Sequence, residues 1–92
     1  MRYSFRRSYI TSVKKLDKGR AANVHKAFES LMEFFRTGEK TPGLGLKQLR
    51  PNLWEVRAGL LDRIVFRKIS ADIVEFIIAG THNEIKKLLK NL

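Results

Sequence analysis

Two runs of mostly apolar residues decide the fold: Arg63-Ile64-Val65-Phe66-Arg67-Lys68-Ile69 and Ile73-Val74-Glu75-Phe76-Ile77-Ile78. Their β-branched and aromatic content is typical of strands. Ala71-Asp72 between them predicts a turn, and so short a connection favours antiparallel pairing. The second run is the more apolar, which predicts that it lies inside the sheet.

Two further strands are expected. Leu53-Trp54-Glu55-Val56-Arg57 begins after Pro51-Asn52 and stops near Gly59. Near the amino end, residues 3–7 alternate between apolar and polar side chains, which predicts a short first strand.

Three segments have the apolar spacing of helices. A short helix is expected from Ser8, as its cap, to a break at residues 17–19. A long helix covers residues 20–36 and ends at Gly38, a favoured C-terminal residue. A last helix begins at about Asn83. The apolar stripes consist of Tyr9, Val13 and Leu16, then Val24, Ala27, Phe28, Leu31 and Phe35, then Ile85, Leu88, Leu89 and Leu92.

The resulting order, β-α-α-β-β-β-α, predicts an α+β fold. We expect a small, mostly antiparallel, four-stranded sheet packed by an N-terminal helical hairpin and a C-terminal helix. The length of 92 residues predicts a single domain spanning residues 1–92. The aromatic residues Phe28, Phe35 and Trp54 are expected in the core, although exposed aromatics also stack on nucleic-acid bases.

Charge limits the choice of partner. Nineteen Lys and Arg against nine Asp and Glu give a net charge of +10. Such a surface attracts polyanions, so nucleic acid is the first candidate partner, before a membrane surface or an acidic protein. The alternative is a basic protein whose charge only keeps it soluble. The sequence contains no cysteine, which fits a reducing compartment. No apolar run is long enough to span a bilayer, and we expect a cytoplasmic protein.

Four stretches, taken in order, resemble the RelE/ParE superfamily of toxins from type II toxin–antitoxin modules, in particular its RelE, YafQ and HigB-like branches. They cover nearly the whole chain: Val13-Lys14-Lys15-Leu16-Asp17, Leu46-Lys47-Gln48-Leu49-Arg50 with the strand at 53–57, Arg63-Ile64-Val65-Phe66-Arg67, and Gly80-Thr81-His82-Asn83-Glu84.

The resemblance implies a ribosome-dependent mRNA endonuclease that needs no metal and no other cofactor. Its partners would be mRNA in the ribosomal A site and a cognate antitoxin, with a monomeric free toxin. Two alternatives stay open. One is a ParE-like inhibitor of DNA gyrase, and the other is a catalytically degenerate toxin homologue that only binds nucleic acid.

Cleavage of RNA without a metal needs a base, an acid and cations on the phosphate. The resemblance implies that Arg63 binds phosphate. The alternative is an arginine on a strand edge that only faces solvent. The resemblance also implies that His82 is the general acid. The alternative is a residue that only starts the last helix. Glu55 is a candidate base, or it pairs with Arg57 or a nearby lysine.

The cations are candidate contacts to the RNA backbone, with solvated basic side chains as the alternative. These are Lys47, Arg50, Arg57 and Arg67. Because Trp54 and Val56 alternate with Glu55 and Arg57, we expect the charged pair to face a groove on the side away from the helices. Asp62 is either an acidic site residue or a turn residue.

The sequence also departs from the family pattern. Leu44 or Gly45 stands where one branch has a catalytic glutamate, and residues 84–88 lack an aromatic. The general base is therefore not settled by the sequence. His25 is expected to be a surface residue, because it lacks the spacing of a metal ligand with His82.

The partner is expected to be an acidic, partly disordered antitoxin that wraps the basic surface. The C-terminal helix is short, and short helices are marginal unless docked. We therefore expect it to be the most mobile element and to compete with the antitoxin.

Overall fold

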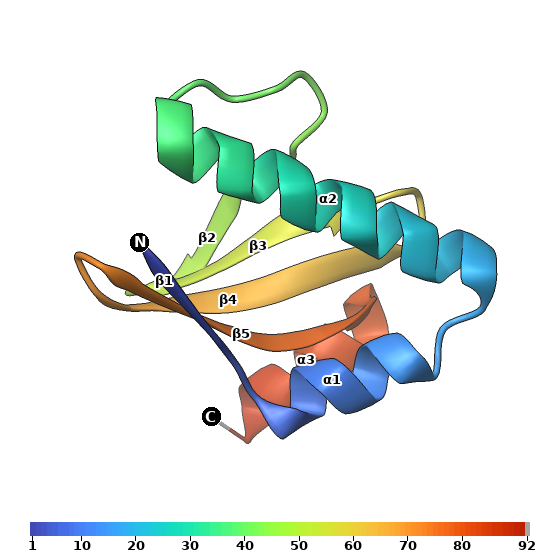
Figure 1. Cartoon of the computed structure of the whole chain (residues 1–92). Helices are drawn as coiled ribbons and strands as arrows, with labels where there is room; N and C mark the ends of the chain where they lie inside the picture. Colours follow the sequence, from blue (N-terminus) through green and yellow to red (C-terminus); the bar gives the residue numbers. More distant parts are fainter. Residues whose placement is uncertain (92) are drawn as a thin grey trace.

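A computed structural model describes residues 1–91, and Leu92 at the end of the last apolar stripe lies outside them. Residues 1–91 form five strands and three helices (Figure 1). In chain order they are β1 (Arg2–Phe5), α1 (Arg7–Lys14), α2 (Lys18–Thr37), β2 (Lys47–Arg50), β3 (Leu53–Ala58), β4 (Asp62–Ser70), β5 (Ile73–Thr81) and α3 (His82–Lys90).

The strands form one mixed sheet in the order β1-β5-β4-β3-β2. β1 is parallel to β5, and the other pairs are antiparallel. The α+β fold is confirmed, as is the interior place of β5. The expected count of four strands was wrong by one. Residues 47–50 form an edge strand that pairs with β3, Lys47 lying opposite Glu55. An edge strand needs no continuous apolar run, so this segment looked like a loop in the sequence.

The two faces of the sheet carry separate hydrophobic clusters. On one face, Val24, Ala27 and Leu31 of α2 are buried with strand residues such as Val56 and Phe76. On the other face, a smaller cluster contains Leu53, Val65, Ile77 and Ile85 of α3. Side chains alternate between the faces along each strand. The apolar stripes of the sequence are therefore the core positions of the fold.

The N-terminal helices pack on different parts of the sheet: α1 lies against β5, whereas α2 crosses β3 and β4 (Figure 1). β1 pairs with β5 only as far as Phe76. Beyond Phe76, two serines of α1 hydrogen-bond to the backbone of β5 in place of a neighbouring strand. The hydroxyl of Ser8 donates to the Ile77 carbonyl, and Ser12 Oγ accepts from the Ala79 N–H at 3.0 Å. The prediction that Ser8 caps α1 was wrong, because Arg6 is the N-cap and makes no side-chain cap bond.

The ends of α2 follow the sequence signals. Asp17 is the N-cap, and its carboxylate accepts from the Arg20 N–H at 2.9 Å. Gly38 ends the helix with φ of 78° and donates to the Phe34 carbonyl at 2.7 Å, as a left-handed C-terminal residue does. Within residues 1–91, no helix combines the length and apolar character required to cross a membrane.

Candidate functional site

Three strand ends and one helix start meet at one end of the sheet. β3 ends and β4 begins at the pair Ala58 and Asp62. Asp62 is in turn paired with Thr81, the last residue of β5. α3 starts at the next residue, His82. We call this end the His82 end of the sheet. The register alone therefore puts the candidate acid at the same end as the start of β4.

Glu55 and Arg63 form an ion pair near this end, on the face opposite α2. Glu55 Oε2 lies 3.0 Å from Arg63 Nε. Glu55 is only 8% exposed, so its carboxylate depends on this partner to offset its loss of water. The sequence left open a pairing of Glu55 with Arg57 or with a nearby lysine. In the structure, Glu55 pairs with Arg63 instead.

Two more cations lie opposite the members of this pair in the strand register. Lys47 is the cross-strand partner of Glu55, and Arg57 is the partner of Arg63. Both are exposed. Like charges directly opposite each other destabilise a sheet unless an anion lies near. Lys47, Arg57 and Arg63, which we call the cationic cluster, thus outnumber the one carboxylate between them. Trp54 and Val56 point to the other face, into the core under α2.

His82 is the first residue of α3, and its side chain is exposed. Arg63 lies opposite Gly80, which is two residues before His82 in the chain. Among residues 1–91, the His82 imidazole has no hydrogen-bond or ion-pair partner within the chain. The ring is therefore available to a ligand.

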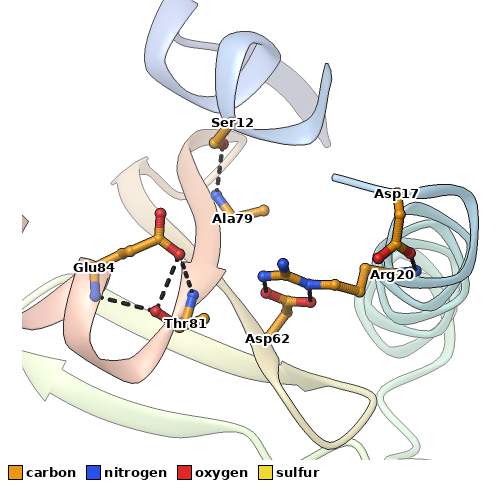
Figure 2. A network of polar contacts seen from close by, with 7 residues as sticks. All are labelled: Ser12, Asp17, Arg20, Asp62, Ala79, Thr81 and Glu84. Carbon is orange, nitrogen blue, oxygen red and sulfur yellow. Dashed lines mark hydrogen bonds and ion pairs between the residues drawn. The ribbon is translucent and has the colours of Figure 1, made fainter. Parts of the chain in front are cut away.

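The backbone around His82 is fixed by a capping box (Figure 2). Thr81 Oγ1 accepts from the Glu84 N–H at 3.3 Å, and Glu84 Oε1 accepts from the Thr81 N–H at 2.9 Å. This backbone hydrogen bond is the main reason that the pKa of Glu84 lies below its usual value. A methyl group on Gly80 would lie 3.0 Å from Glu84 Oε1. The close approach of α3 to the end of β5 thus depends on that glycine.

Arg20 pairs with the buried Asp62, a contact that the sequence did not predict. The guanidinium donates twice to the carboxylate, at 2.8 and 2.6 Å, and Asp62 is 1% exposed (Figure 2). The hydrogen bond to Asp62 raises the pKa of Arg20. Asp62 is thus a buried strand residue that ties β4 to α2. The one available signal was an aspartate at the start of an apolar strand, which requires a buried partner.

The remaining predicted cations lie elsewhere. Arg50 donates to the Leu89 carbonyl of α3 at 2.6 Å. Arg67 is opposite Leu53 and Glu75, about 13 Å along β4 from Arg63. The structure therefore groups Lys47 and Arg57 with Arg63, and it separates Arg50 and Arg67 from them.

No protein-family model and no curated protein sequence matches the chain. Solved structures do match, among them a YafQ mutant from E. coli, with a TM-score of 0.68 at 12% identity over 91% of this chain and 96% of that one. A YoeB/ParE toxin from Agrobacterium tumefaciens gives 0.66 at 20% identity, over 89% and 99%. The toxin–antitoxin complex RelB-RelE from Methanococcus jannaschii gives 0.65 at 14% identity, over 92% and 96%.

The chain has the RelE/YafQ toxin fold. The fold that the sequence resemblance implied is therefore confirmed.

On this RelE/YafQ scaffold the cationic cluster is suited to a phosphate group. Arg57 and Arg63 each present a planar fork that matches two phosphate oxygens. The exposed imidazole of His82, at the same end of the sheet, is a side chain that can act as an acid or a base. His25, by contrast, lies on the exposed surface of α2, 3.3 Å from Glu29. Within residues 1–91, no three His, Asp or Glu side chains form a group that could hold a metal ion.

Proposed function

We propose that this protein is the toxin of a type II toxin–antitoxin module and cleaves mRNA in the ribosomal A site. The single observation that carries the proposal is the cationic cluster around Glu55 at the His82 end of the sheet. The net charge of +10 supports it, because RNA is a polyanion. The likeness in fold to YafQ and RelE toxins also supports it.

The chemistry follows from the residue types. The 2′-hydroxyl attacks the adjacent phosphorus, the new 2′-O–P bond forms and the P–5′-O bond breaks. Arg63 and Arg57 neutralise the charge that builds on the phosphate oxygens. His82, in its protonated form, donates its proton to the departing 5′-oxygen. The products are a 2′,3′-cyclic phosphate and a free 5′-hydroxyl.

The proton of the 2′-hydroxyl goes to Glu55 in this scheme. Its carboxylate starts in the ion pair with Arg63, 3.0 Å away. When the guanidinium turns to the phosphate, the carboxylate is released from this contact and can accept the proton of the 2′-hydroxyl. Substrate binding thus activates the base.

The pairing of Glu55 also favours a second candidate, a toxin homologue that binds RNA without cleaving it. If Arg63 stays paired with Glu55 when RNA is bound, no carboxylate is free to act as the base. The cationic cluster then only holds the phosphate. This candidate predicts binding without product.

The proposed partner is an acidic antitoxin. Several solved structures of this fold are toxin–antitoxin complexes, including RelB-RelE and DinJ-YafQ. α3 docks through the buried Ile85, and its other face is formed by Lys86, Lys87 and Lys90. We propose that the antitoxin competes for the surface beneath α3. Hydrogen exchange in α3 as slow as in β4 and β5 would contradict this.

Cell-free translation tests the function. Wild-type protein is expected to cut mRNA inside ribosome-bound codons, as mapped from the new 5′ ends. His82→Ala and Arg63→Ala are each expected to lower cleavage by ~10²-fold or more. His25→Ala, which removes an exposed histidine on α2, is the matched control and should cut normally. Intact mRNA and undisturbed translation with wild-type protein would refute the nuclease.

A further inference from the structure

The turn between β3 and β4 exposes two leucines at the His82 end of the sheet. Leu60 is 98% exposed and Leu61 is 61% exposed. Tight turns favour Gly, Asn, Asp, Ser and Pro, whose side chains suit the backbone or the solvent. Two adjacent leucines break this local preference, and such breaks concentrate at functional sites.

The backbone of this turn is held in place. Gly59 has φ of 71°, and a Cβ atom there would lie 2.6 Å from Asn23 Nδ2 of α2. The next residue pair, Ala58 and Asp62, closes the hairpin. Asp62 is fixed in turn by its two hydrogen bonds from Arg20. The leucines therefore project from a rigid support.

The turn lies next to the cationic cluster. Arg57 and Arg63 are cross-strand partners. They form the pair next to Ala58 and Asp62, on the side away from the turn. Leu60 is three residues from either arginine, which is at most about 10 Å along the chain. One nucleotide spans such a distance. The turn thus adds an apolar surface within reach of a base whose phosphate is bound at the arginines.

We propose that Leu60 and Leu61 form a wedge that packs against a base of single-stranded RNA next to the phosphate held by Arg57 and Arg63. The proposal rests on the proposed function in taking RNA as the ligand. Charge favours RNA over an apolar protein partner, because the leucines lie close to two arginines, Arg57 and Arg63. Proteins also insert leucine between bases in other nucleic-acid complexes.

The test measures binding of a short 2′-O-methyl RNA, which cannot be cleaved because its 2′-oxygen is blocked. Fluorescence anisotropy compares wild type with the double variant Leu60→Ser/Leu61→Ser. We expect about fivefold weaker binding, which equals the lower end of what an aromatic side chain stacked on a base contributes. Ile69→Ser is the matched control. Ile69 is 53% exposed, but it lies at the other end of β4, and its replacement should not change affinity.

The salt dependence identifies the kind of contact. Each phosphate contact adds about 0.7 to the slope of log affinity against log salt for single strands. Leu60→Ser/Leu61→Ser should leave this slope unchanged, whereas Arg57→Gln should lower it. An oligonucleotide that lacks the contacted base should bind wild type and double variant equally.

Equal affinity of wild type and double variant for the complete oligonucleotide, including no binding by either, would overturn the wedge. An equal loss of RNA affinity in Ile69→Ser would also overturn the wedge. Melting temperatures should agree within error, because both leucines are exposed. Uncut mRNA on the ribosome would refute the nuclease but leave this comparison intact, since the probe is not cleaved.

Discussion

Glu55 Oε2 and Arg63 Nε lie 3.0 Å apart on neighbouring strands, with Glu55 only 8% exposed. In the proposed mechanism this carboxylate accepts a proton only after Arg63 has moved away. The same contact gives Arg63 a structural role beside its proposed role on the phosphate. Substitutions at Arg63 must therefore be separated into these two effects.

Arg63→Ala is expected to lower the free energy of unfolding by about 1 to 2 kcal/mol, because it leaves Glu55 poorly solvated and unpaired. Adding Glu55→Gln should restore part of this loss. Urea unfolding of both single variants and the double variant gives the coupling energy. Strictly additive effects would show that the ion pair does not stabilise the fold.

Arg20→Met is expected to cost about 3 kcal/mol, since it strands the Asp62 carboxylate in the interior. Asp62→Asn in the same background removes the buried charge and should recover much of the stability. Urea unfolding measures both. Arg36→Met, which removes an exposed arginine paired with Glu33, is the control and should change stability little. An equal cost in both variants would contradict the burial argument.

Ser12→Ala is expected to cost about 1 to 2 kcal/mol, because the buried Ala79 N–H loses its acceptor. Hydrogen exchange at the Ala79 amide should accelerate. Thr11→Ala changes an exposed neighbour on the same helix and should leave this amide protected. Unchanged exchange at Ala79 in Ser12→Ala would mean that another group accepts this hydrogen bond.

The capping box gives a dependence of stability on pH. The Thr81 N–H holds the pKa of Glu84 below its usual value, which is about 4.3 for a glutamate. A lowered folded-state pKa contributes stability above the usual value, and this contribution disappears as the pH falls through the lowered pKa.

Glu84→Gln should therefore lose less stability on acidification below about pH 4.3 than wild type does. The comparison needs urea unfolding at several pH values. Glu39→Gln, at an exposed site after α2, should follow the wild-type curve. Parallel curves for wild type and Glu84→Gln would contradict the role of the cap.

Local patterns predicted most of the fold. The stripe through Val24 and Leu31 and the alternation around Val56 each depend on residues close in sequence, so periodicity was enough. The edge strand at residues 47–50 was missed because its pairing comes from β3 and not from its own composition. The same limit hid the Arg20–Asp62 pair, whose members are far apart in the chain.

The candidate site was predictable in part. The alternation of side chains predicted that Glu55 and Arg57 lie on the face away from α2, and the structure has them there, although Glu55 is buried and only Arg57 is exposed. Sequence could not give the partner of Glu55, because Arg63 reaches it only through the register of β3 and β4. The roles of His82, Arg63 and Glu55 in catalysis remain predictions.

The most direct test of the account concerns His82 as the general acid. Single-turnover cleavage on programmed ribosomes compares ordinary mRNA with mRNA whose scissile 5′-oxygen is replaced by sulfur. A thiolate leaves without being protonated, so it needs no acid. His82→Ala should cleave ordinary mRNA ~10²-fold or more slowly than wild type and recover most of the rate on the sulfur substrate. An equal defect on both substrates would contradict the assignment of His82 as the acid.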